Sequence, residues 1–243
     1  MSRSNAEAFL YDLLLSRVST ERDWFVQSYE NLKKSTAERD LHIFMGLAPR
    51  KLGKADLAPS AEELAAANAV YDGWKIDGWS IDGAARVLGL LAFPRTRPFA
   101  DLFKDLRRTS DAAEMIALYR GLPVYPEPDS LAFEVGEGLR SNLRPVFEAI
   151  AHHNPYPRDQ FDDHRWNHMI LKALFVDTEL TPIMGLESRA NAELARILVD
   201  YAAERNAAGR PISPELWIPV APFKDDPEIR SRLDRLGDAV PSL

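Results

Sequence analysis

The sequence predicts an all-α protein, and two patterns carry this prediction. Apolar residues recur three and four positions apart along most of the chain, which places them on one face of a helix; one such run is Leu194, Ile197, Leu198 and Tyr201. Alternating apolar and polar residues, the pattern of a half-buried strand, are missing, and the segments between turns favour Ala, Leu, Glu and Arg over Val, Ile and Thr.

Capping and turn residues set the expected helix boundaries. Ser35 with Glu38 and Ser60 with Glu63 fit the capping box, in which a hydroxyl accepts from a backbone N–H and a later carboxylate reaches back. Further start signals are Thr20, Ser80, Ser110 and Ser213, and stop signals are Gly53, Gly73, Gly121 and Gly209. The predicted helices, in order, span residues 4–18, 20–34, 36–51, 60–72, 80–93, 97–108, 110–120, 130–153, 158–176, 188–208 and 226–236.

Three of these helices have special features. Pro145 removes a backbone donor inside 130–153, so that helix should bend or divide there. The segments 81–93 and 166–176 are apolar on most faces, which predicts central helices buried on several sides.

Grouped in pairs, the helices form αα-hairpins whose second members start near residues 36, 80, 110, 145 and 188, at steps of roughly 40 residues. This spacing fits a HEAT- or armadillo-like solenoid; an irregular helical bundle fits as well, because no sequence repeat has that period. We interpret the proline-rich stretch 121–128 as a turn inside one all-helical domain over residues 1–243.

Composition narrows the class of function. The net charge of −7 argues against a general nucleic-acid binder, which needs a basic face, and the absence of cysteine excludes disulfides, thiolate metal ligands and cysteine nucleophiles. No run approaches the ~18 apolar residues of a membrane span. Glu7 and Asp12 interrupt the apolar start of the chain, so we expect no signal peptide and a cytoplasmic protein.

Histidines are concentrated between residues 152 and 168. His164 and His168 lie four residues apart on one predicted helix, and two imidazoles at that spacing can chelate a metal, with His152, His153 or Asp162 completing the ligand set. However, no glutamate lies between the two histidines, and Lys172 follows one turn later, where its charge opposes a dication. Capping, core hydrogen bonding or an anion pocket is therefore favoured over a metal site.

Cationic residues form the second group. Arg86 interrupts an apolar run, and Arg140 and Arg144 are helical neighbours; with His168 and Lys172 they can line a pocket for a phosphate or carboxylate. The alternative is a set of ion pairs at helical spacing, in which these arginines are bound to Asp82, Glu137 and Glu148.

Several segments resemble the EboA family, over residues of about 40 to 223. The resemblance rests chiefly on 166–175 and 185–191, and also on 48–50, 79–80, 84–86, 118–123, 137–142, 152–157, 198–202 and 204–205. The sequence differs from the family pattern at residues 203–206. Family members often carry His-Glu-Arg-Trp near this position, and this chain has Ala-Glu-Arg-Asn, which ends at Asn206.

This resemblance implies a place in the ebo gene cluster, which is associated with making or moving a secondary metabolite. The neighbouring genes resemble a prenyltransferase, a sugar-phosphate cyclase, a TIM-barrel isomerase-like protein and a metal-dependent hydrolase. No established reaction and no cofactor follow from it. The expected partners are a small anionic metabolite or other proteins of the cluster.

Two hypotheses remain open from the sequence. The first is an accessory protein that binds a phosphorylated or prenylated intermediate, or a partner enzyme, and its expected ligand-binding residues are Arg86, Arg140, Arg144, His153, Asn167, His168 and Lys172. The second is an enzyme that uses acid–base or metal-dependent chemistry on an anionic intermediate through the histidine region 152–168, because imidazole titrates near neutral pH.

Overall fold

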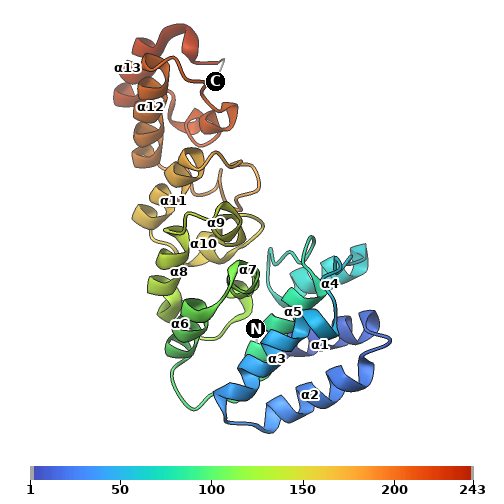
Figure 1. The fold of residues 1–243 in the computed structure, drawn as a ribbon. Helices are drawn as coiled ribbons and strands as arrows, with labels where there is room; N and C mark the ends of the chain where they lie inside the picture. Colours follow the sequence, from blue (N-terminus) through green and yellow to red (C-terminus); the bar gives the residue numbers. More distant parts are fainter. Residues whose placement is uncertain (1–2, 242–243) are drawn as a thin grey trace. The chain divides into compact units, whose positions relative to one another are not determined.

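Helices form nearly all the regular structure of the chain (Figure 1). The computed structural model describes residues 3–241; residues 1–2 and 242–243 of the predicted single domain lie outside this range. The α-helices are α1 (Arg3–Arg17), α2 (Arg22–Lys34), α3 (Glu38–Lys51), α4 (Ala61–Val70), α5 (Ile81–Ala92), α6 (Phe99–Thr109), α7 (Ala112–Arg120), α8 (Ala132–Leu139), α9 (Arg144–Ala151), α10 (Tyr156–Gln160), α11 (Asp163–Phe175), α12 (Ala192–Ala207) and α13 (Pro227–Leu236).

Five short 3-10 helices join them: η1 (Leu122–Val124), η2 (Pro128–Leu131), η3 (Pro214–Trp217), η4 (Ala221–Phe223) and η5 (Gly237–Ala239). The described residues contain no β-sheet, only an isolated bridge between Asp56 and Ser80. The all-α prediction is confirmed.

A side-chain cap explains the start of six described α-helices: α4, α5, α7, α11, α12 and α13. The capping box of Ser60 and Glu63 is present at α4, and Ser80 caps α5 by accepting from Gly83 N at 3.2 Å. The predicted box at Ser35 is wrong, because its hydroxyl accepts from Ala37 N in a turn and donates to Asp40, and α3 begins at Glu38.

Two predicted helices are divided. The segment 130–153 separates into α8 and α9, with Pro145 in the first turn of α9, where its missing N–H costs no helical bond. The segment 158–176 separates into α10 and α11, because the Asp162 side chain caps α11 by accepting from Arg165 N at 2.7 Å.

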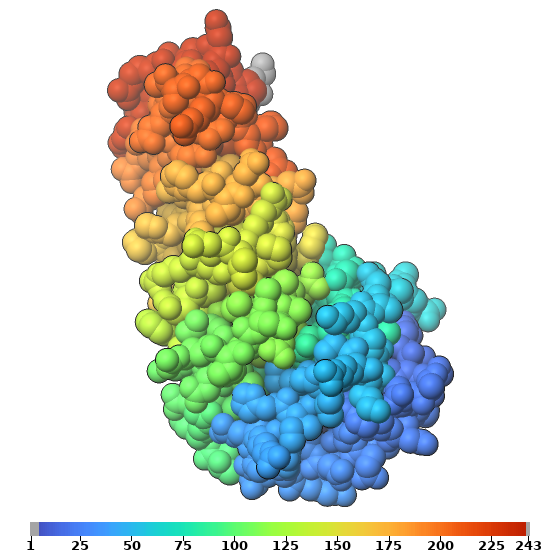
Figure 2. Space-filling model, viewed as in Figure 1, coloured from blue at the N-terminus to red at the C-terminus, as the bar shows by residue number. Residues whose placement is uncertain are grey.

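The chain divides into two compact units, the first ending at Tyr156 and the second beginning at Pro157. In the first unit α5 packs against α1, α3 and α7, and nearly all of its residues are buried, as expected for a central helix. Buried apolar side chains of α1, α2 and α3 pack together in this unit, which Figure 2 shows in blue, and a hollow of about 180 Å³ remains between α2 and α3.

In the second unit α12 packs against α11 and α13. The prediction that 166–176 is buried on several sides is wrong, because α11 keeps an exposed face that carries His164, His168 and Phe175. No described helix is both long and apolar enough to cross a membrane. The single-domain organisation and the solenoid stay predictions.

Candidate functional site

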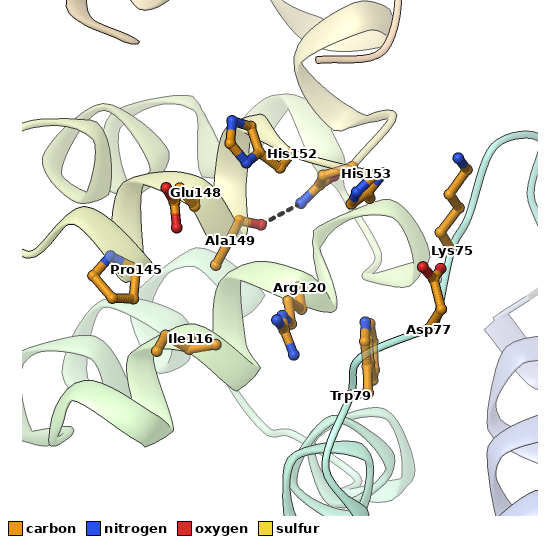
Figure 3. Close-up of a pocket in the computed structure, with 11 residues that line it drawn as sticks. Lys75, Asp77, Trp79, Ile116, Arg120, Pro145, Glu148, Ala149, His152 and His153 are labelled. Atoms are coloured by element: carbon orange, nitrogen blue, oxygen red, sulfur yellow. Dashed lines mark hydrogen bonds between the residues drawn. The ribbon is translucent and has the colours of Figure 1, made fainter. Parts of the chain in front are cut away.

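A cavity of about 190 Å³ lies in the first unit (Figure 3). Three segments far apart in the sequence line it: the loop between α4 and α5, one side of α7, and one side of α9 with the residues that follow it. Its lining residues are Lys75, Asp77, Trp79, Ile116, Arg120, Pro145, Glu148, Ala149, His152, His153 and Asn154. An engineered apolar cavity of about 150 Å³ holds benzene, so this volume suits a ligand of about one six-membered ring.

Hydrogen bonds to two of its backbone carbonyls hold the loop that supplies Trp79. The Trp79 carbonyl accepts from Leu57 N at 2.7 Å, and the Gly78 carbonyl accepts from Arg120 Nη1 at 2.8 Å. The indole of Trp79 packs edge-to-face on that of Trp74, with ring centroids 6.0 Å apart. The loop therefore presents a fixed aromatic wall to the cavity.

Asn154 fixes the opposite side. Its buried amide donates to Ala149 O at 2.9 Å and to Tyr119 O at 3.0 Å, and its side-chain oxygen accepts from Tyr156 N at 3.0 Å. These bonds turn the chain sharply after α9 and hold His152 and His153 at the edge of the cavity. His153 adopts a left-handed backbone with φ of 52°.

Arg120 is the cation most deeply set in the cavity. Burial lowers the pKa of Arg120, and the nearby carboxylates of Asp77 and Asp56 partly oppose this effect. Within the described residues its one hydrogen bond goes to the Gly78 carbonyl, and it forms no ion pair. A guanidinium carries five N–H donors, so Arg120 retains donors for a ligand.

A family model described as "Metabolite traffic protein EboA" matches residues 6–221. The chain belongs to the EboA family. Comparison with curated proteins and with solved structures finds no match. The description of the EboA family supports an accessory role in metabolite traffic.

Three of the segments that resemble EboA proteins meet at this cavity. They are Trp79–Ser80, residues 118–123, which include Arg120, and residues 152–157 with both histidines. Arg120, Asp77 and Lys75 were missed as site residues from sequence alone. Arg120 could have been predicted as a site residue from its position in segment 118–123, which resembles the EboA family.

The structure puts the predicted arginines of this EboA protein into ion pairs. Arg86 Nη1 lies 2.6 Å from Asp82 Oδ2, and both side chains are buried. Arg140 pairs with Glu137, and Arg144 Nε lies 2.6 Å from Glu148 Oε1. The alternative of helical ion pairs is confirmed; an anion site at these arginines stays a prediction.

His153 is the one residue of the predicted ligand-binding set that lines this cavity. In the second unit the Asn167 amide exchanges hydrogen bonds with Asn191, at 3.2 and 2.9 Å. His168 is exposed, its ring centroid lies 4.3 Å from that of His164, and Lys172 is half-buried. Among the described residues no group of three or more His, Asp or Glu gathers as a metal site would require.

We expect the pKa of His153 to lie below 6.5, its ordinary value. Burial is the main cause and Lys75 the second, with His152 and Arg120 adding to the lowering and Asp77 opposing it. Because the folded state favours neutral imidazole, this group's contribution to stability is present above pH 6.5 and is lost as the pH falls through its folded pKa. A proton NMR titration of the imidazole Cε1–H measures that pKa.

Lys75→Met provides the matched variant. It removes a positive charge, so the pKa of His153 should rise toward the ordinary value. An unchanged pKa in this variant would show that Lys75 does not act on His153.

Proposed function

We propose that this EboA-family protein is a non-catalytic accessory protein that binds a small anionic metabolite in the first-unit cavity. The observation that supports it most is Arg120, a partly buried guanidinium with one hydrogen bond and no ion pair among the described residues. Burying an uncompensated charge is unfavourable, so an anionic ligand would stabilise this arrangement.

The volume of the cavity narrows the ligand further. About 190 Å³ accommodates a phosphorylated or carboxylated head of one ring's size. A prenyl chain attached to that head would have to extend outside the cavity. Handing over such an intermediate to a pathway enzyme in the cytoplasm would fit the description of the EboA family as metabolite traffic proteins.

Arg120→Gln should strongly reduce co-purification of the ligand. Glutamine keeps a neutral N–H donor but removes the positive charge, and a charged hydrogen bond contributes about 1.5–3 kcal/mol, a loss of roughly 10- to 100-fold in affinity. Native mass spectrometry of the full chain, purified from cells that express the whole ebo cluster, measures the bound small molecule.

Arg140→Gln is the matched control, because Arg140 is exposed and paired with Glu137. The proposal predicts full ligand occupancy in this control. Loss of the ligand in Arg140→Gln with retention in Arg120→Gln would overturn it and would support the arginine pocket predicted from sequence.

One observation favours the enzyme hypothesis as a second candidate. His153 lies at the cavity edge, and burial favours its neutral imidazole, the form that can accept a proton. The same preparation distinguishes the two functions. A bound molecule whose mass changes on incubation with the wild type, but not with His153→Asn, would establish catalysis.

A further inference from the structure

Trp79 has a donor that no protein atom uses. Its side chain is almost fully buried, with 4% exposed, and its Nε1 makes no hydrogen bond within the described residues. Unlike Nε1 of the neighbouring Trp74, it is not sealed off from open space. Figure 3 shows the nitrogen end of the indole directed toward the cavity. A buried indole N–H normally finds an acceptor, so this one is placed for an acceptor on a ligand.

Arg120 lies beside this donor. It is bonded to the carbonyl of Gly78, the residue before Trp79, and both side chains also line a small recess of about 20 Å³ that shares part of the cavity wall. Two donors from different elements thus face one volume. One of them is neutral and directional, and the other is charged.

Asp77 places a negative charge near these two donors, so the ligand must also be compatible with a carboxylate. Its carboxylate is exposed, forms no hydrogen bond or ion pair within the described residues, and acts electrostatically on both Arg120 and His153. A bare anion in the cavity is repelled by this carboxylate. A ligand with a hydroxyl or amine near its anionic group would instead donate a hydrogen bond to it.

We propose that Trp79 Nε1 and Arg120 together bind one oxyanion group of the ligand, and that Asp77 selects compounds with a hydroxyl or amine donor next to that group. This inference rests on the proposed function and specifies its substrate class: small hydroxylated or aminated phosphates or carboxylates.

The test is a titration of the full chain with three probes: inorganic phosphate, glycerol 3-phosphate and glycerate. Isothermal calorimetry gives the affinity of each. The wild type should bind glycerol 3-phosphate or glycerate more tightly than inorganic phosphate, and the better of the two identifies the oxyanion as phosphate or carboxylate.

Trp79→Phe should weaken binding of the preferred probe by roughly 10- to 100-fold, the value of one hydrogen bond to a charged oxygen, while keeping the aromatic wall. Trp24→Phe is the matched control: it is the same change at an indole of α2 that lines no part of this cavity. Trp24→Phe should bind as the wild type does. Equal affinities in Trp79→Phe and wild type would overturn the shared-oxyanion arrangement.

Asp77→Asn should tighten binding of inorganic phosphate and reduce the preference for the hydroxylated probe, because it removes the repulsion and weakens the acceptor. Weaker phosphate binding in this variant would overturn the role given to Asp77.

The two proposals fail in different ways. In one case the wild type binds none of the three probes, but it co-purifies with a molecule from the ebo-expressing cells, and Arg120→Gln does not. The oxyanion assignment is then wrong, and the proposed binding function stands. If no Arg120-dependent molecule co-purifies in the first place, the binding function itself fails.

Discussion

Replacing Gly138 with alanine should destabilise the first unit by about 3 kcal/mol. A Cβ at this position would lie 2.3 Å from Tyr119 Cζ, 2.5 Å from Tyr119 Oη and 2.6 Å from Ile150 Cδ1. Both neighbours are completely buried, and the Tyr119 hydroxyl donates to Glu134 O at 3.0 Å, so the ring cannot move without losing that bond. Urea unfolding followed by circular dichroism measures the change.

Gly136→Ala is the matched control in the same helix, α8. Its Cβ would have one neighbour, Arg140 Nη1 at 3.9 Å, so no overpacking follows. Alanine is a better helix former than glycine by about 0.8–1 kcal/mol, and the control should be neutral or stabilised. If Gly138→Ala unfolds at the same urea concentration as Gly136→Ala, α8 does not pack against Tyr119 as closely as described above.

Asp82→Ala should cost about 3–5 kcal/mol of folding stability. Asp82 and Arg86 are 2% and 3% exposed, and removing the carboxylate leaves the guanidinium buried with Glu114 Oε1 at 3.8 Å as its remaining ion-pair partner. Arg86 Nε already lacks a hydrogen-bond partner, so the site has no spare acceptor. Thermal and urea unfolding of the variant give the loss.

Two comparison variants make this expectation specific. Glu137→Ala breaks the ion pair between Glu137 and Arg140, which has similar helical spacing but an exposed arginine. This variant should change the free energy of unfolding by less than about 1 kcal/mol. The double variant Asp82→Ala with Arg86→Met should be more stable than Asp82→Ala, because it leaves no unpaired buried charge. A double variant no more stable than the single one would contradict this account.

The helical class was predictable because the signals are local. The box at Ser60 and Glu63 and the division at Pro145 involve neighbours in sequence, and both appear as expected. Ser110 failed as a start because Asp111, one residue later, forms a complete box with Glu114 and caps α7 instead. Competition between adjacent caps is decided by backbone geometry, which the sequence pattern does not contain.

The cavity was only partly predictable. Helical periodicity shows which face of a helix is buried but not which helices become neighbours, so the meeting of Asp77, Arg120 and His153 could not be derived from spacing. The pairing of Arg86 with Asp82 was visible as an i, i+4 relation. Its burial, which makes it structurally important, depends on the packing of α5 against α1, α2, α3 and α7.

The hydrogen bond from Arg120 to Gly78 has an entropic consequence. A free arginine side chain carries roughly 2 kcal/mol of rotamer entropy, which a ligand must suppress when it binds. Here the Gly78 carbonyl restricts the Arg120 side chain before any ligand binds. The loss of rotamer entropy therefore occurs during folding and not during binding. A weakly charged or scarce metabolite would therefore meet a cation already oriented, and the rigidity of the loop between α4 and α5 would contribute to affinity in addition to the loop's own side chains.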